Sequence, residues 1–162
     1  MPSPSARLAG LGLTLPPVAS PAGAYVPAVR DGDLVWTAGQ LPLVDGRLVA
    51  TGLVGEAVDA ERAAQLARIA ALNALAAVAA QAGGLDGIVR IVKVVGFVAS
   101  AAGFTAQPAV LNGASELFVD VFGDAGLHAR SAVGVASLPL GAPVEVEVVA
   151  RVAAPARDRA EA

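Results

Sequence analysis

The sequence predicts a single α+β domain in which two helices lie on one face of a β-sheet. Three observations support this: a long amphipathic helical segment in mid-chain, short strand-like segments with hairpin turns before it, and a strand, a helix and two strands after it. A chain of 162 residues has the length of one domain and can bury its own core. We expect residues 1–14 to form an N-terminal extension and residues 154–162 a flexible tail.

The first third of the chain favours short strands joined by tight turns. Residues 1–24 are rich in Pro, Gly, Ser and Ala, and we expect one short helical turn near residues 7–11. Strands are expected at residues 25–29 and 34–39, on either side of the turn signal Asp31-Gly32. A second hairpin is expected around Asp45-Gly46.

A long helix is expected over residues 59–81. Asp59 suits its N-cap, Glu61 suits its first turn, and Gly83-Gly84 would end it. The side chains that recur at spacings of three and four, as an apolar stripe against a sheet requires, are Leu66, Ile69, Leu72, Asn73, Leu75, Ala76 and Val78.

The remaining segments complete the predicted sheet. Residues 88–99 are apolar on both sides, which is typical of a strand covered on both faces. A second helix is expected over residues 108–122, with Pro108 in its first turn and Gly123 or Gly126 closing it. Residues 133–137 and 144–152 are expected to form a final hairpin.

The composition indicates self-association. Hydrophobic residues make up 56% of the chain and charged residues only 15%, against about a quarter in ordinary domains. A membrane span is not favoured, because no window has the ~20 uninterrupted apolar residues that one needs. With two helices on one sheet face, the opposite face must be covered, and partner subunits are the simplest cover.

Charge and residue usage exclude several kinds of site. A net charge of −3 with scattered basic residues argues against binding nucleic acid. The chain has no cysteine and one histidine, which excludes disulfides, thiolate metal sites and multi-histidine metal sites. The apolar run after Arg7 is too short and too weakly basic for a convincing signal peptide, so we expect a cytoplasmic protein.

The candidate site residues are Arg130 and the carboxylates of Glu145 and Glu147. The planar fork of an arginine fits a carboxylate, and a glutamate near a bound substrate can position or activate water. Alternatively, Arg130 forms a surface ion pair and the two glutamates belong to a half-solvated strand. In the expected hairpin, Glu145 lies opposite Ala136 and shares a face with Arg130 at about 20 Å, so a common site would cross a subunit boundary.

The sequence leaves the roles of other polar residues open. His128 could act as a general base, although a loop or interface histidine is the simpler interpretation. Asn112 is either a site residue or a solvent-exposed one. Tyr25 is either a site residue or a packed ring whose hydroxyl is exposed to solvent. Ser115 has no nucleophile context.

Several segments together resemble the Rid (YjgF/RidA-like) family of enamine/imine deaminases. Residues 35–42, Val-Trp-Thr-Ala-Gly-Gln-Leu-Pro, resemble the family's strand that ends in a Gly-Gln-(apolar)-Pro turn. Asn73-Ala74-Leu75 with Gly83-Gly84 resembles its first helix. Residues 128–133, with Leu138-Pro139 and residues 144–147, resemble its C-terminal signature. The resemblance covers roughly residues 15–152.

The resemblance implies a chorismate-mutase-like fold, with a mixed sheet and two helices on one face, assembled as a homotrimer with clefts between subunits. It implies that Arg130 binds the substrate carboxylate and that Glu145 positions water. The other substrate-binding residues that it implies are Tyr25, Ala38, Gly39, Asn112, Ser131 and Ala132. Ala38 and Ala132 stand where some members carry polar residues, which makes the pocket more apolar.

The implied reaction is hydrolysis of 2-imino or enamino acids to 2-oxo acids and ammonia, without cofactor or metal. The expected partners are a small carboxylate-bearing ligand and further copies of the chain, not nucleic acid or a membrane. The alternative is a non-catalytic protein that binds or senses a small carboxylate through Arg130 and does not need Glu145. The net charge argues against the endoribonuclease activity ascribed to some members.

Overall fold

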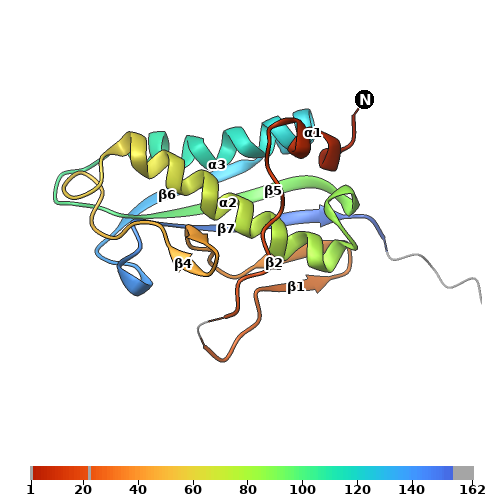
Figure 1. The fold of residues 1–162 in the computed structure, drawn as a ribbon, viewed down its shortest axis with the longest axis horizontal. Helices are drawn as coiled ribbons and strands as arrows, with labels where there is room; N and C mark the ends of the chain where they lie inside the picture. The colour runs from red at the N-terminus through yellow and green to blue at the C-terminus, as the bar shows by residue number, and fades with distance from the viewer. Residues whose placement is uncertain (1, 22, 155–162) are drawn as a thin grey trace, which may run out of the picture.

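A five-stranded sheet is the framework of the domain (Figure 1). The computed structural model describes residues 2–21 and 23–154. In this part of the chain the strand order is β1-β2-β7-β5-β6, and every neighbouring pair is antiparallel except β5 and β6. The strands are β1 (Ala28–Asp31), β2 (Leu34–Thr37), β5 (Ile88–Ala99), β6 (Ala129–Val135) and β7 (Val144–Val152). The predicted α+β class and mixed sheet are confirmed.

Two tight hairpins form where the Asp-Gly signals predict them. β1 and β2 are joined through the two-residue turn 32–33. β3 (Leu43–Val44) and β4 (Arg47–Leu48) form a small separate sheet. Its turn residues Asp45 and Gly46 have φ angles of 51° and 73°, and positive φ at both central residues is the geometry that a two-residue hairpin favours.

The long central helix α2 spans Ala60–Ala82, as predicted. The Asp59 carboxylate accepts a hydrogen bond from the Arg62 backbone N–H at 2.7 Å, and Gly83 ends the helix with a φ of 74°. By length and composition α2 could cross a bilayer, but 67% of its most apolar window is buried inside the domain. Its apolar composition is therefore explained by its place in the core.

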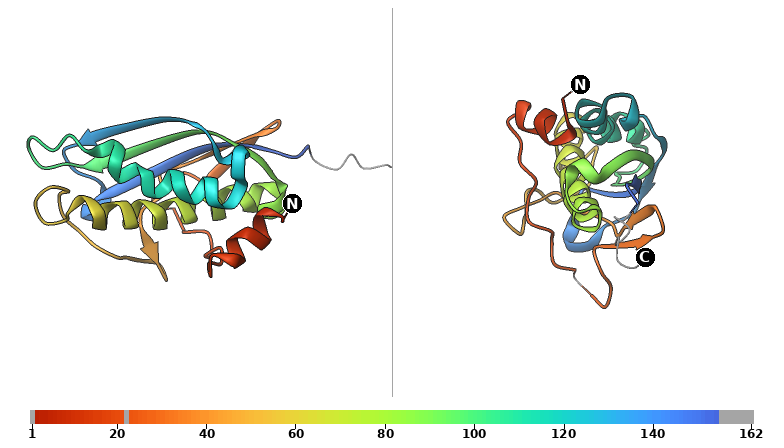
Figure 2. Two further views of the ribbon diagram at one scale, coloured as in Figure 1. Left: turned by 90° about the horizontal axis from the view of Figure 1, so that it is seen from above. Right: turned by 90° about the vertical axis from the view of Figure 1, so that its right-hand side faces the viewer.

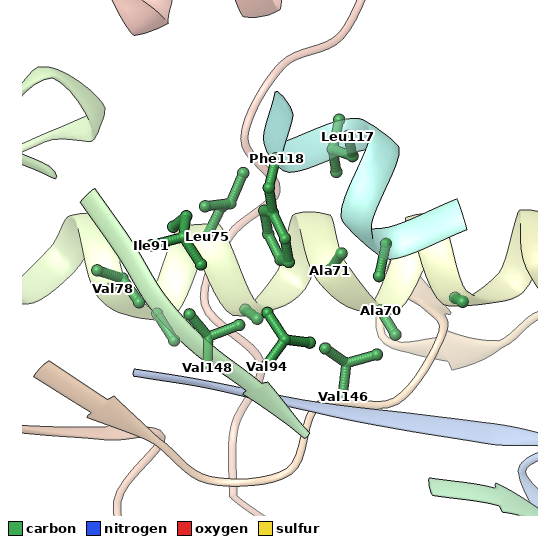
Figure 3. Packing of buried hydrophobic residues seen from close by; sticks show 14 of the residues in the cluster. Ala70, Ala71, Leu75, Val78, Ile91, Val94, Leu117, Phe118, Val146 and Val148 are labelled. Carbon is green, nitrogen blue, oxygen red and sulfur yellow. The ribbon is translucent and has the colours of Figure 1, made fainter. Parts of the chain in front are cut away.

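Helix α3 (Gln107–Phe122) packs beside α2 on the same face of the sheet (Figure 2). The Phe118 ring points from α3 toward Val94 of β5, with Leu75 of α2 beside it (Figure 3). All three side chains are fully buried. The core thus lies between these two helices and one sheet face, and no helix of the described residues covers the opposite sheet face.

A third helix, α1 (Pro4–Gly10), forms where we expected an extension with one helical turn. Leu8 is buried in the core, and the Ser5 backbone N–H and hydroxyl donate to the Asp86 carboxylate at 2.8 and 2.7 Å. Because these partners are 81 residues apart, the local sequence pattern does not reveal that α1 packs on the domain. Residues 155–162 of the expected tail lie outside the described residues.

The last two strands do not form the hairpin that we expected. β5 lies between β6 and β7 and pairs with both. β5, α3 and β6 form a strand–helix–strand crossover, in which the two strands lie parallel and pair with each other. β7 pairs with the opposite edge of β5. β6 also begins at Ala129 rather than at residue 133, which places Arg130 inside a strand.

The close approach of α2 and α3 generates a stability prediction. A Cβ on Gly113 of α3 would overlap the Ala64 carbonyl of α2. We expect Gly113→Ala to lower the free energy of unfolding by about 1–3 kcal/mol, as overpacking does, measured by urea denaturation. Gly10→Ala is the matched control, since nothing lies within 4 Å of a Cβ there. Equal midpoints for the two variants would contradict this packing.

Candidate functional site

Most of the predicted site residues fall into two groups on opposite faces of the sheet. The first, which we call the glutamate cavity, is lined by Tyr25, Ala38, Gly39, Glu145 and Glu147. The second, the arginine edge, is built by Arg130 of β6 with Asn112 and Ser115 of α3 and with His128, which precedes β6.

Strand β7 places two carboxylates on the sheet face that carries no helix. Val144, Val146 and Val148 point into the core and are buried, so the alternating residues Glu145 and Glu147 point to the opposite face. Burial raises the pKa of Glu145, and the charge of Glu147 raises it further. Burial also raises the pKa of Glu147. A glutamate whose pKa is raised in this way is better able to accept a proton near neutral pH.

The backbone of Gly39 lies directly against the Glu145 side chain. A Cβ on Gly39 would overlap the Glu145 carboxylate, so glycine at this position lets the Glu145 side chain lie where it does. The next residue, Gln40, is buried and exchanges two backbone hydrogen bonds of 2.9 Å with Val146. The buried Asn73 of α2 donates to two carbonyls of the segment that follows, at 3.0 Å each. β7 and α2 together therefore fix the strand end beside Glu145.

A cavity of about 880 Å³ opens beside the two glutamates. Its walls are mainly apolar and include Tyr25, Val29 and Trp36, which are 50, 54 and 52% exposed. Such large side chains on an exposed sheet face mark a surface that is suited to an apolar ligand or to another protein chain.

The Arg130 side chain is held by α3 and keeps one edge free. Nη1 donates to the Asn112 Oδ1 and the Ser115 Oγ at 3.0 Å each, and Nη2 donates to the Pro108 carbonyl at 3.1 Å. A guanidinium has five N–H donors, so the Nε–H and one Nη2–H have no protein acceptor among the described residues. These adjacent donors form a fork that fits a carboxylate. The ion pairs within residues 2–21 and 23–154 do not involve Arg130, so the surface ion pair considered above is not observed.

His128 and Ser115 also belong to the arginine edge, and the sequence did not indicate that these two residues contact each other. The His128 Nδ1 lies 2.6 Å from the Gly126 carbonyl, and its Nε2 lies 3.0 Å from the Ser115 Oγ. Burial lowers the pKa of His128 and the Arg130 charge lowers it further, while the hydrogen bond to Gly126 opposes both. Ser115 and His128 lie on different elements, so only the fold reveals their contact. The one signal available in the sequence was the i, i+3 spacing of Asn112 and Ser115, which places both on one face of a helix.

Arg130 and Glu145 do not share a face, contrary to the expectation from the hairpin. Their partners on β5 are Val94 and Phe97, three residues apart, and neighbours at odd spacing point to opposite faces. Two strand spacings and three residues of rise separate the Cα atoms by roughly 14 Å. Within one chain these two side chains cannot contact the same small ligand.

Ser131 and Ala132 follow the alternation of β6. The Ser131 Oγ accepts a hydrogen bond from the Lys93 Nζ at 2.8 Å on the sheet face that carries no helix. Ala132 pairs with Gly96 and packs against the core on the helix face. Of the two residues, only Ser131 shares a sheet face with Glu145.

Comparisons with known proteins agree with this fold. Residues 5–152 match the family described as "YjgF/chorismate mutase-like, putative endoribonuclease". The chain is 42% identical to Protein TCP17 of Trypanosoma cruzi over 146 residues, which cover 90% of this chain and 91% of that protein.

Two solved structures extend the comparison. Atu1372 of Agrobacterium tumefaciens, a protein of unknown function, is 46% identical with a TM-score of 0.85, over 93% of this chain and 92% of that one. Escherichia coli TdcF with bound serine is 28% identical with a TM-score of 0.60, over 84% of this chain and 94% of that one.

These matches and the fold define an α+β protein of the chorismate-mutase-like class. The chain belongs to the YjgF family, in agreement with the resemblance found in the sequence.

The raised pKa values of Glu145 and Glu147 generate a prediction about stability and pH. Each carboxyl has a higher pKa in the folded state than its ordinary 4.5. As the pH rises from 4.5 through the folded-state pKa, each therefore lowers the free energy of unfolding. We expect Glu145→Gln to raise the free energy of unfolding at pH 7 and to leave it unchanged at pH 4, in urea denaturation at both pH values. Glu56→Gln, at an exposed position, is the control, with no change expected at either pH. A destabilised Glu145→Gln at pH 7 would contradict the assignment.

Proposed function

We propose that the protein hydrolyses 2-imino and 2-enamino acids to 2-oxo acids and ammonia, in the cytoplasm, at clefts between the subunits of a homotrimer. The observation that carries this proposal is the separation of the free fork of Arg130 from the Glu145 carboxylate onto opposite faces of one sheet. Each chain holds one half of a site in which a substrate carboxylate and an attacking water could both be bound.

The exposed sheet face supports assembly of these halves from different subunits. Val29, Trp36 and Val133 leave it largely apolar, and each is at least 44% exposed in the single chain. In a cyclic assembly one patch of each subunit meets a different patch of the next. The proposed trimer brings the arginine edge of one subunit over the glutamate cavity of its neighbour.

In the proposed mechanism, Arg130 binds the substrate carboxylate through its Nε–H and Nη2–H and thereby places the C=N carbon near Glu145. An enamine first becomes the imine by gaining a proton on its β-carbon from solvent and losing one from nitrogen to solvent. Glu145 accepts a proton from water as the water oxygen bonds to the C=N carbon, and the nitrogen is protonated. In the resulting carbinolamine the hydroxyl proton passes through Glu145 to the amine nitrogen, the C–N bond breaks, and ammonia and the 2-oxo acid are released. Positioning supplies much of the acceleration, and proton transfer supplies the remainder.

The relatives favour a small carboxylate over a phosphodiester as ligand. TdcF holds serine, an amino acid, according to its structure's description, and the free fork of Arg130 suits such a carboxylate. The family description also mentions endoribonuclease activity. Phosphodiester binding relies on clusters of basic residues, whereas the glutamate cavity carries two carboxylates and the chain a net charge of −3. We therefore propose deamination.

An assay of 2-oxo acid formation tests the roles of both residues. Imines would be generated in situ from several amino acids by an amino-acid oxidase. We expect Arg130→Ala to lower kcat/KM on the order of 10- to 100-fold, since a hydrogen bond to a charged group contributes about 1.5–3 kcal/mol. Loss of general base catalysis should make Glu145→Gln lower kcat by about 100-fold or more.

Arg68→Ala is the matched control, because Arg68 pairs with Asp120 at the surface; it should retain full activity. Unchanged rates in both site variants would refute the deaminase. If neither wild type nor variants accelerate any imine, and calorimetry shows that 2-oxo acid binding depends on Arg130 but not on Glu145, the non-catalytic binding protein is the correct alternative.

A further inference from the structure

His128, Ser115 and Arg130 form a chain of hydrogen bonds whose direction is determined by its first member. The Gly126 carbonyl can only accept, so the His128 Nδ1, 2.6 Å away, carries a hydrogen and donates it. In a neutral imidazole the Nε2 is then an acceptor, and the Ser115 hydroxyl, 3.0 Å away, donates to it. The Ser115 oxygen keeps its lone pairs for the Nη1–H of Arg130, at 3.0 Å.

Three acceptors thus surround the guanidinium on one side. The Ser115 Oγ and the Asn112 Oδ1 take both hydrogens of Nη1, and the Pro108 carbonyl takes one of Nη2. Rotation of the guanidinium would break these hydrogen bonds. The arrangement therefore leaves the Nε–Nη2 edge as the edge that is available to a carboxylate.

We propose that His128 and Ser115 are positioning residues, which hold the Arg130 guanidinium with its Nε–Nη2 edge free for the substrate carboxylate and do so only while the imidazole is neutral. This inference rests on the proposed role of Arg130 in carboxylate binding. If His128 gains a proton, its Nε2 becomes a donor and can no longer accept the hydrogen bond from the Ser115 hydroxyl. The charged ring is then a second cation beside Arg130. The orientation of Ser115 then changes and the hold on Nη1 weakens.

The charged groups around His128 favour the neutral ring. Arg130 lies on β6, and Arg90 of β5 and Arg151 of β7 line a cavity of about 460 Å³ together with His128. The acidic residues on the other elements packed nearby, Glu116 of α3 and Asp124 of η2 (Gly123–Gly126), are exposed. Burial and the Arg130 charge lower the pKa of His128 below its ordinary 6.5, so the ring loses its proton below neutral pH.

The first test is the affinity of each variant for pyruvate, a 2-oxo acid of the product class, measured by calorimetry at pH 7.5. We expect Ser115→Ala and His128→Leu to raise the Kd on the order of tenfold, as loss of a hydrogen bond to a charged group does. Ser115→Thr keeps the hydroxyl and should restore most of the affinity. In the deaminase assay Ser115→Ala should raise KM far more than it lowers kcat, since it acts through carboxylate binding. Ser137→Ala, at an exposed position, is the matched control.

The second test is the dependence of the Kd on pH. For wild type we expect the Kd to rise severalfold as the pH falls from 7.5 through the range, below 6.5, in which His128 gains its proton. His128→Gln offers an amide oxygen to Ser115 at every pH, so its Kd should not rise. Glu145 and Glu147, whose pKa values are raised, lose their negative charge as the pH falls and so favour carboxylate binding, which is the opposite effect.

The outcomes separate this inference from the proposed function. If Arg130→Ala abolishes pyruvate binding while Ser115→Ala and His128→Leu bind as wild type does, the positioning role is wrong and the role of Arg130 stands. If Arg130→Ala itself binds pyruvate normally, the proposed function fails. An identical rise in the Kd of wild type and His128→Gln at low pH would overturn the part assigned to the imidazole. Circular dichroism of each variant excludes unfolding as the cause.

Discussion

The position of β5 between β6 and β7 is the constraint on which the rest of the structure depends. Because β5 pairs with Arg130 through Val94 and with Glu145 through Phe97, the strict alternation of side chains along strands sends the two residues to opposite faces. A hairpin of β6 and β7 would have placed both on one face. The same pairing thus builds the sheet and divides the candidate site into an arginine edge and a glutamate cavity.

Each half is made rigid by groups that are themselves buried or packed. The segment around Gly39 is fixed by its backbone pairing with β7 and by Asn73, a buried polar residue whose two hydrogen bonds hold the segment to α2. On the other face α3 supplies three acceptors to Arg130, and the Ser115–His128 pair orients one of them. Preorganised groups of this kind need not be reordered when a ligand binds.

Local sequence signals predicted local structure well. Asp59 and Gly83 set the ends of α2, and the Asp-Gly pairs set both hairpins, because caps and turns depend on residues that are adjacent in the chain. The order of the strands, the packing of α1 through Leu8, and the contact of Ser115 with His128 depend on partners far apart in sequence. Asn73 was placed correctly in the buried stripe, but its hydrogen bonds to the strand end could be seen only in the fold.

In the proposed trimer, Arg130 of one subunit and Glu145 of another form one site, and subunit mixing tests this arrangement most directly. Arg130→Ala and Glu145→Gln chains, each strongly impaired when assembled alone, would be mixed in equal amounts, unfolded, refolded together and assayed. Random assembly of a cyclic trimer should restore about a quarter of the wild-type activity, because one site in four then combines an intact arginine with an intact glutamate. Mixtures that assemble as wild type does and are no more active than the separate variants would contradict the shared site.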